Sequence, residues 1–410
     1  MTLPAPSRPL RLGVFVAERV HVGGGHQQSL NAAMLASRAG TNGWLIICLT
    51  PYLDNVRALE EIGLKAIHLP MSRWHSLCLA IRRRVRHPRL LRMLRRLMGA
   101  NAVEALIERH EIDLVYFTSP TGLARDLERT NFLVTIWDLC HRDHPEFPEV
   151  RDDREFERRE RYCRQVLPKA VAVFADSPLG AQNLVRRYGL DSERVRVMPS
   201  APSRQTLGTP LGEDIRKRFG IDGDYVFYPA QFWAHKNHVF ILQAMALLQR
   251  RHGVRLHAIF AGGDAGGNLA HVKAQAQALG LDECVHFAGF VPAREMPDLY
   301  QQALALVMPT YFGPTNLPPL EALHLGTPVI YPRPLAVASR IDSVVRCIDL
   351  DNPESLVAEL LRLAQSTRNN AQFVVDAARN TLAHVDDDDT RLATLKSVLS
   401  AFARKRSAWI

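Results

Sequence analysis

Short apolar runs rich in β-branched and aromatic residues alternate with helical stretches along most of the chain. They form two series, one before residue 200 and one after residue 222. Runs that are apolar throughout and separated by helices are typical of parallel strands covered on both faces. The pattern therefore predicts an α/β fold with two doubly wound domains. The predicted strands are 11–17, 43–50, 65–70, 113–120, 132–138, 170–177, 195–200, 224–230, 255–263, 285–290, 303–310, 328–332 and 344–350.

The break between the two series is rich in Pro, Ser, Gly and Thr, as a linker is. A chain of 410 residues has room for two or three domains at about 150 residues each. The expected division is an N-terminal domain at 1–205, a linker at 206–222, a C-terminal domain at 223–385 and a last helix at 386–410, with packing of that helix back on the N-terminal domain as one option.

The positive charge of the chain is concentrated in one segment. Lys and Arg exceed Asp and Glu by 51 to 42, and residues 71–98 hold nine arginines and no acidic residue. The leucines of this segment share one side of a predicted helix, which suits an anionic membrane surface. An ordinary packed helix with solvated arginines and a nucleic-acid contact are the alternatives, although no nucleic-acid motif accompanies the segment. The residues expected to contact the membrane are Arg89, Arg92, Arg95 and Arg96.

The cysteines and the hydropathy pattern indicate a cytoplasmic protein, peripheral to a membrane at most. No two of the six cysteines are closer than 23 residues, so neither a zinc spacing nor a disulfide framework is indicated. No apolar run approaches the roughly 18 residues that a membrane span needs. The acidic run 386–389 is interpreted as the first turn of a helix, and no metal site is expected.

Two loops after predicted strands could hold an anion. Gly23, Gly24 and Gly25 precede a helix expected from about His26, and a glycine turn lets backbone N–H groups approach a phosphate. A flexible connecting loop is the alternative reading. Gln231 and Lys236 follow the predicted strand 224–230, at the edge where open α/β sheets bind ligands. Taken alone, such a lysine is more often an exposed side chain.

The stretch 309–332 combines a loop, a helix start and an acid. The N–H groups of Thr315, Asn316 and Leu317 can point at a ligand just before the helix. Glu321, one turn in, can accept two hydrogen bonds from a vicinal diol such as a ribose. The alternative is that this acid only stabilises the helix, because a negative charge in the first turn interacts favourably with the helix dipole.

Together these segments resemble the retaining GT-B glycosyltransferases of glycosyltransferase family 4, most strongly over 224–332. The resemblance implies two Rossmann-like domains facing an interdomain cleft. It also implies a nucleotide-diphosphate sugar as donor and retention of the anomeric configuration. No cofactor or protein-bound metal is implied, because a lysine and helix dipoles neutralise the leaving diphosphate.

The family pattern assigns a role to several positions of this chain. Gln231 and Lys236 match the pair that holds the donor diphosphate, although the family usually has arginine where this chain has Gln231. Glu321 matches the glutamate that binds the ribose, whereas the glutamate that contacts the donor sugar falls on Gly313, so backbone N–H groups near Asn316 would replace it. The remaining matches, near the nucleotide and its base, are Gly263, Phe290 and Val291.

The stretch TIWDLCHRDHPEFPEV at 135–150 resembles the family's acceptor-side HDxxH segment. Trp137 stands at the first histidine, while Asp138 and His141 remain and are candidate site residues. A purely structural histidine is the alternative for His141.

We therefore expect a glycosyltransferase that moves a sugar from a nucleotide-diphosphate donor to a glycan or lipid-linked glycan. GDP-mannose is the first candidate for the donor. Cell-surface polysaccharide or lipopolysaccharide assembly fits this resemblance. A non-catalytic, membrane-associated glycan- or nucleotide-sugar-binding protein is one alternative, because the first family glutamate is absent. A nucleotide-sugar 2-epimerase, which shares the architecture, is the other.

Overall fold

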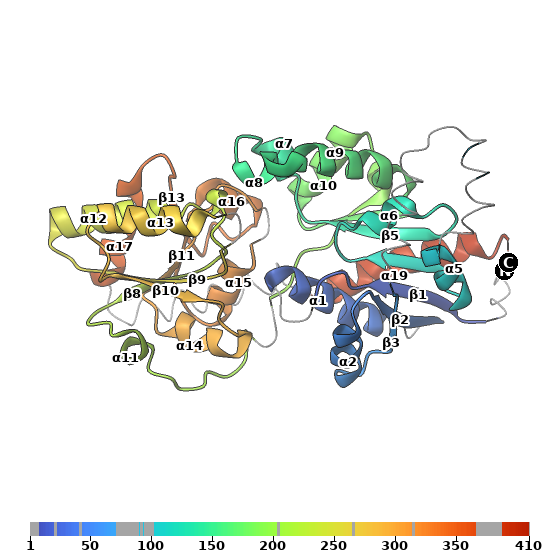
Figure 1. The fold of residues 1–410 in the computed structure, drawn as a ribbon, viewed down its shortest axis with the longest axis horizontal. Helices are drawn as coiled ribbons and strands as arrows, with labels where there is room; N and C mark the ends of the chain where they lie inside the picture. Colours follow the sequence, from blue (N-terminus) through green and yellow to red (C-terminus); the bar gives the residue numbers. More distant parts are fainter. Residues whose placement is uncertain are drawn as a thin grey trace. The chain divides into compact units, whose positions relative to one another are not determined.

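The computed structural model of the chain describes residues 8–19, 23–40, 43–70, 90, 93, 102–202, 206–264, 267–313, 316–365 and 388–409. Each of the apolar runs contains a strand, so the predicted strand positions are confirmed. All the strand pairs are parallel, and they form two sheets with helices between successive strands. The α/β, doubly wound fold expected from the sequence is thus confirmed (Figure 1).

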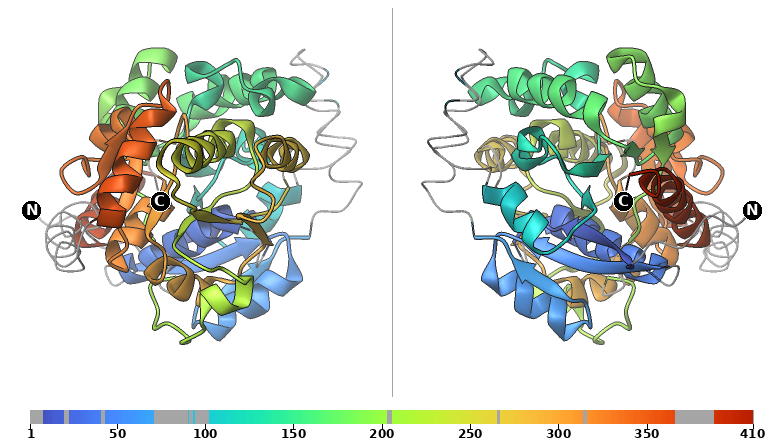
Figure 2. Two further views of the ribbon diagram at one scale, coloured as in Figure 1. Left: turned by 90° about the vertical axis from the view of Figure 1, so that its left-hand side faces the viewer. Right: turned by 90° about the vertical axis from the view of Figure 1, so that its right-hand side faces the viewer.

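The first sheet has the strand order β3-β2-β1-β4-β5-β6-β7. Its central strands are buried on both faces, as their uniformly apolar sequences require. Figure 2 shows the first strands of this sheet, in blue, from two sides. Its strands are β1 (Leu10–Phe15), β2 (Trp44–Thr50), β3 (Ala66–His68), β4 (Leu114–Phe117), β5 (Asn131–Ile136), β6 (Ala172–Ala175) and β7 (Val195–Val197).

The helices packed with this sheet have clear local start and stop signals. For example, the Ser177 hydroxyl accepts a hydrogen bond from the Gly180 N–H at 3.0 Å, and Gly189 ends the same helix with φ +62°. The helices are α1 (Gly23–Ala39), α2 (Leu53–Glu61), α5 (Ala102–Arg109), α6 (Gly122–Asp126), α9 (Glu155–Val166), α10 (Pro178–Tyr188) and α19 (Asp388–Arg406), with short 3₁₀ turns η2 (Leu167–Lys169) and η3 (Ser192–Arg194).

The second sheet has the order β10-β9-β8-β11-β12-β13. The chain therefore starts in the middle of the sheet, builds one half outward and then returns to build the other half beside β8. The strands are β8 (Tyr225–Pro229), β9 (His257–Ala261), β10 (Val285–Gly289), β11 (Ala305–Val307), β12 (Val329–Pro332) and β13 (Arg346–Ile348).

Helices cover both faces of the second sheet. In Figure 1, α12 and α13 lie over one face, and α14 lies on the other. The helices are α11 (Ile215–Phe219), α12 (His238–His252), α13 (Asn268–Ala278), α14 (Met296–Gln301), α15 (Leu317–His324), α16 (Arg333–Ala338) and α17 (Pro353–Gln365), with 3₁₀ turns η4 (Ala234–Lys236) and η5 (Ala293–Glu295).

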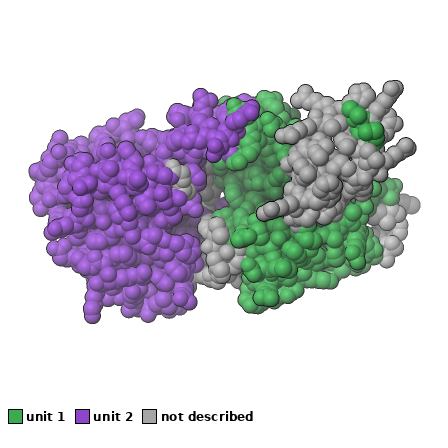
Figure 3. Space-filling model, viewed as in Figure 1, with its two compact units in different colours: residues 1–139, 157–198, 388–410 green, residues 140–156, 199–387 purple. Residues whose placement is uncertain are grey.

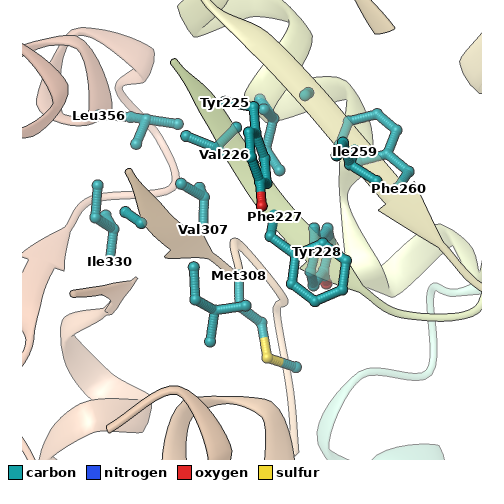
Figure 4. Close-up of a cluster of buried hydrophobic side chains, with 14 of the residues drawn as sticks. Tyr225, Val226, Phe227, Tyr228, Ile259, Phe260, Val307, Met308, Ile330 and Leu356 are labelled. Atoms are coloured by element: carbon teal, nitrogen blue, oxygen red, sulfur yellow. The ribbon is translucent and has the colours of Figure 1, made fainter. Parts of the chain in front are cut away.

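The core of the second sheet is built around β8. Tyr225, Val226, Phe227 and Tyr228 are fully buried, and they contact apolar side chains from the neighbouring strands (Figure 4). Two of these buried tyrosines keep their hydroxyls paired, as burial of a polar group requires. The Tyr225 hydroxyl donates to the Leu299 carbonyl at 2.8 Å, and the Tyr228 hydroxyl donates to the Lys236 carbonyl at 2.9 Å.

The chain divides into two compact units (Figure 3), at boundaries that differ from the expected ones. Unit 1 consists of residues 1–139, 157–198 and 388–410, and unit 2 of 140–156 and 199–387. The prediction of one continuous N-terminal domain over 1–205 is therefore wrong for 140–156. That segment contains α7 (Cys140–Asp143), α8 (Pro148–Arg151) and the turn η1 (Asp152–Arg154), and its side chains pack on unit 2.

The expected linker at 206–222 is also partly wrong, because it contains α11 and is bonded into unit 2. The Asp298 carboxylate accepts hydrogen bonds from the Leu211 and Gly212 N–H groups at 2.8 and 3.1 Å. Asp214 caps α11 by accepting from the Lys217 N–H. The Pro and Gly content of this stretch reflects tight turns around a short helix rather than an unattached connection.

The last helix, α19, lies beside α1 in unit 1 and is dark red in the right-hand view of Figure 2. Its apolar stripe of Leu395, Val398, Leu399 and Phe402 is buried in the core of the first sheet. Asp388 in its first turn accepts from the Arg38 guanidinium at 2.6 Å, which agrees with the interpretation of the acidic run.

Within the described part of the chain, none of the helices has both the length and the apolar character needed to cross a membrane. The four arginines expected to contact a membrane, Arg89, Arg92, Arg95 and Arg96, lie outside the described residues.

Candidate functional site

The loops after β8 and β11 meet at one edge of the second sheet. These two strands are neighbours, and the strand order reverses between them. In open α/β sheets the crevice at such a reversal is where ligands bind, just beyond the carboxyl ends of the strands. The loop after β8 leads to Lys236, and the loop after β11 leads to Asn316 and α15.

Lys236 and Asn316, both predicted site residues, are brought into contact. Lys236 ends the turn η4, and its Nζ donates a hydrogen bond to the Asn316 Oδ1 at 3.1 Å. Asn316 is the residue before the first turn of α15, where Pro318 and Pro319 occupy positions that need no N–H donor. An ammonium group therefore lies next to the start of a helix, and both favour a negatively charged ligand.

The Asn316 side chain organises the loop before α15. Its Nδ2 donates to the Gly313 carbonyl at 2.8 Å and to the Tyr331 hydroxyl at 2.7 Å. Gly313 has φ +119°, and a Cβ there would lie 2.6 Å from the Asn316 amide atoms. This position thus requires glycine, which gives a physical reason for the missing carboxylate. Thr315 lies outside the described residues.

We expect Gly313→Glu to damage the site rather than to supply the missing carboxylate. A side chain at this φ is strained by about 1 to 3 kcal/mol, and its Cβ displaces Asn316 from Lys236. Thermal unfolding and nucleoside diphosphate affinity should both fall, whereas Gly223→Ala, with nothing near its Cβ position, should change neither. An active, fully stable Gly313→Glu variant would contradict this geometry.

Glu321 is buried in α15, with 7% of its surface exposed. Its Oε2 accepts a hydrogen bond from the hydroxyl of Tyr300, a fully buried residue of α14, at 2.8 Å. Burial and the charge of Glu321 raise the pKa of Tyr300 well above its usual value, so its hydroxyl stays a donor. Tyr300 fixes the orientation of the carboxylate. The sequence pattern did not single it out, because it reads as an ordinary core tyrosine.

The loop after β8 is held by a close backbone contact. A Cβ on Gly262, at the end of β9, would lie 2.1 Å from the Ala230 carbonyl oxygen. The predicted site residue Gly263 follows it and accepts from the Phe232 N–H at 3.2 Å. Gln231 is exposed, and its Oε1 accepts from the Trp233 indole at 2.9 Å, so its predicted role beside Lys236 stays a prediction.

The two residues predicted near the base follow β10. Phe290 is 63% exposed, which is unusual for a ring of this size. Val291 is partly buried and packs on the core of the second sheet. Their predicted contact with a nucleotide base is not tested by this arrangement.

His238 begins α12 and is wholly buried between Tyr228 and Phe232, with ring centroids 4.7 and 4.5 Å away. Burial lowers its pKa from 6.5 to about 3, because the charged imidazolium is unfavourable there. Between about pH 3 and pH 6.5 the His238 ring is protonated in the unfolded chain and neutral in the folded chain. Above about pH 6.5 His238 should therefore not lower the free energy of unfolding of unit 2. As the pH falls from 6.5 toward 3, that free energy should decrease.

From pH 7.5 to 5.0 we expect His238 to lower the free energy of unfolding by about 2 kcal/mol. The matched variant His238→Phe keeps an aromatic ring in the same place but does not titrate. Urea unfolding at the two pH values measures the difference. Equal losses in the wild type and the variant would show that His238 does not cause the effect.

In unit 1 the glycines of the first loop lie inside a helix. The helix α1 begins at Gly23, so Gly24 and Gly25 form its first turn, and the expectation of a glycine loop before a helix at about His26 is wrong. Trp137, which stands where the family pattern has histidine, limits the space at Gly25. A Cβ on Gly25 would lie 3.1 Å from its ring.

Asp138 and His141 have structural contacts of their own. Asp138 accepts from the Arg159 guanidinium at 2.9 Å within unit 1. His141 belongs to unit 2, is 1% exposed and packs edge-on against Phe156 with ring centroids 5.6 Å apart. Their proposed contact with an acceptor stays a prediction.

One pair of residues at this edge was missed from the sequence. Glu149 accepts a hydrogen bond from the backbone N–H of His235 at 2.9 Å and also contacts its ring Nδ1. Glu149 lies in a stretch of mixed charge that reads as a solvated loop, and 86 residues separate the two partners. The preceding Pro148 was the available signal, since it marks the start of the short helix that carries Glu149.

Two family models match the chain, one in each half. Residues 213–380 match Glycosyl transferases group 1, and residues 33–201 match Glycosyltransferase Family 4. The second sheet and the site at its edge thus lie in the group 1 match, and most of the first sheet lies in the other.

Curated relatives match over part of their length. The chain is 25% identical over 197 residues to mannosylfructose-phosphate synthase of Agrobacterium fabrum, covering 45% of this chain and 43% of that protein. It is 30% identical over 199 residues to D-inositol 3-phosphate glycosyltransferase of Corynebacterium jeikeium. This match covers 45% of this chain and 48% of that protein. The chain therefore spans under half the length of these relatives.

The fold is also similar to solved structures over nearly the whole chain. The crystal structure of Anabaena HepE in complex with UDP and glucose has a TM-score of 0.70 at 16% identity. The match covers 96% of this chain and all of that one. It supports the GT-B class expected from the sequence, with two Rossmann-like domains.

Proposed function

Since the chain belongs to the group 1, family 4 glycosyltransferases, we propose that it transfers a sugar from a nucleotide-diphosphate donor to an acceptor hydroxyl. The observation that carries the proposal is the contact between Lys236 and Asn316 at the start of α15. This contact puts an ammonium group and the start of α15 at the edge of the sheet where ligands bind.

In the proposed reaction the bond between the sugar C1 and the diphosphate oxygen breaks, and an acceptor hydroxyl forms the new bond to C1. Lys236 and the start of α15 stabilise the negative charge that develops on the departing diphosphate. The departing phosphate takes the acceptor proton, so atoms and charge balance without an enzyme nucleophile or a metal. The new bond has the same anomeric configuration as the donor.

Glu321 is the proposed partner of the ribose hydroxyls of the donor. Carboxylate oxygens accept hydrogen bonds from a vicinal diol, and Tyr300 holds this carboxylate in one orientation. Phe290, Val291 and Gly263 belong to the same proposed donor site, near the base. Gln231 and the first turn of α1 are proposed further contacts of the phosphates.

We propose GDP-mannose as the first donor to test and a glycan or lipid-linked glycan of the cell surface as the acceptor. Asp138 and His141 are the proposed residues on the acceptor side. The basic segment 71–98 would hold the protein on an anionic membrane surface, at the inner face of the plasma membrane. These finer assignments rest on the family resemblance and on the arginine-rich sequence.

The test is release of nucleoside diphosphate from a panel of donors, namely GDP-mannose, UDP-glucose, UDP-N-acetylglucosamine and dTDP-rhamnose, with glycan acceptors. We expect one donor to release its nucleoside diphosphate faster when the acceptor is added, and NMR of the product to show retention. Interconversion of two nucleotide sugars without such release would instead indicate an epimerase. Donor binding without any turnover would contradict the catalytic proposal.

A further inference from the structure

A buried carboxylate contacts the turn that carries Lys236. Glu149 and His235 have side chains only 8% and 9% exposed, and a single carboxylate oxygen serves both the backbone N–H and the ring Nδ1 of His235. Burial alone would raise the pKa of Glu149, but the hydrogen bonds from His235 outweigh it and lower the pKa. Glu149 is therefore ionised near neutral pH, and Nδ1 is the ring nitrogen that donates.

His235 links this carboxylate to the second loop of the site. Its ring stacks on Phe312 with centroids 3.9 Å apart and planes 16° from parallel. Its backbone carbonyl accepts from the Tyr311 N–H at 2.9 Å and from the Thr310 hydroxyl at 3.3 Å. Both the turn before Lys236 and the chain before Gly313 are thus fixed by the same histidine.

These contacts and the chain between them form a closed circuit, which runs through His235, Lys236, Asn316, Gly313 and Phe312 and includes the ammonium group. From His235 the chain passes directly to Lys236, whose Nζ donates to Asn316. Asn316 donates to the Gly313 carbonyl, and the chain leads from Gly313 back to Phe312 and its stacked histidine. Glu149 supports this circuit through its two contacts with His235.

We propose that Glu149 is a positioning residue for the phosphate-binding lysine, acting through His235. It belongs to the segment 140–156, which interrupts the sequence of unit 1 and packs on unit 2. The proposal rests on the proposed function in one respect, namely that Lys236 binds the donor diphosphate. It does not require Glu149 to touch the substrate.

The first test needs no nucleotide. Acylation of Lys236 by a water-soluble succinimidyl ester, quantified by peptide mass spectrometry, reports how firmly the ammonium is held, with exposed Lys217 as internal reference. Loss of one hydrogen-bonded support should raise the rate at Lys236 about fivefold in Glu149→Ala. Glu149→Gln keeps an acceptor oxygen for the His235 N–H and should stay closer to the wild type.

The matched control is Glu146→Ala, which removes an exposed carboxylate from the same segment and should change nothing. His235→Phe keeps the stacked ring but loses Nδ1, so it should resemble Glu149→Ala. Should Glu149→Ala fail to fold, His235→Phe carries the test. An unchanged rate at Lys236 in folded Glu149→Ala, or in His235→Phe where only that variant folds, would overturn the proposal.

The second test compares a nucleoside diphosphate with its nucleoside by calorimetry. Glu149→Ala should weaken the diphosphate about tenfold and leave the nucleoside unchanged, since only phosphate binding uses Lys236. Equal weakening of both would show a merely structural role and overturn the proposal. If the wild type binds no nucleoside diphosphate, the proposed function fails, and the acylation rates still decide the role of Glu149.

Discussion

Replacing Lys236 by alanine is expected to lower kcat/KM about 100- to 1,000-fold, the usual effect of removing one group that stabilises a developing charge. Its ammonium is the cation that the structure places against Asn316 at the start of α15. Because the charge on the diphosphate grows as the bond to C1 breaks, kcat should fall as well as affinity. Steady-state release of nucleoside diphosphate measures both.

The control for this variant is Lys217→Ala, which removes an exposed lysine of α11 in the same unit. It should leave kcat and KM unchanged. Lys236→Arg keeps the charge but changes its shape and reach, so we expect partial activity. Wild-type turnover in Lys236→Ala would show that the diphosphate binds elsewhere.

Gly262→Ala is expected to have the largest effect on stability, lowering the free energy of unfolding of unit 2 by about 3 kcal/mol. The added Cβ would lie 2.1 Å from the Ala230 carbonyl oxygen and 2.8 Å from the Gln231 nitrogen. Both are backbone atoms, so no rotamer change relieves the overlap, and the loop after β8 must move. Urea unfolding measures the loss, and nucleotide affinity should fall with it.

The neighbouring Gly263 provides the matched control for this prediction. A Cβ there would have no heavy atom within 4 Å, and its φ lies outside the left-handed region. Gly263→Ala should therefore change stability by less than about 0.5 kcal/mol, as most surface substitutions do. Similar stability of the two variants would contradict the close backbone approach at Gly262.

The strands and the last helix could be predicted because their signals are local. Uniformly apolar runs identified the strands of both sheets, and the helix expected over 386–410 is α19, Asp388–Arg406. The start of α15 was also predictable, since adjacent prolines fit only the first turn of a helix. Lys236 and Asn316 could be named as site residues because each follows a strand at the ligand-binding edge.

The contacts that organise the site could not be predicted, because they join residues far apart in the chain. Glu149 and His235 are 86 residues apart, and Tyr300 and Glu321 are 21 apart. Tyr300 reads as an ordinary core tyrosine and Glu149 as part of a solvated loop, so neither was singled out from the sequence. The same reason explains the domain boundary, since 140–156 lies within the sequence of unit 1 but has its contacts in unit 2.

Backbone geometry was the other feature hidden from the sequence. Gly313 looked like the loss of a family glutamate, whereas its φ of +119° and its contact with Asn316 make glycine necessary in this loop. Gly24 and Gly25 were taken for a loop because glycine disfavours helices. They lie in a first turn, where the ring of Trp137 leaves Gly25 little space for a side chain.

The most direct test of a nucleoside diphosphate site at Lys236 is thermal unfolding of the wild type and Lys236→Ala with GDP, UDP, dTDP and ADP, each compared with its nucleoside. A ligand at 100 times its Kd that binds only the folded state adds about 2.7 kcal/mol of stability. We expect at least one nucleoside diphosphate to raise the unfolding temperature of the wild type. Its nucleoside should do so much less, and Lys236→Ala should remove the difference. No shift of the folded wild type with any of them, or the same shift in both proteins, would contradict a nucleotide-diphosphate site at Lys236.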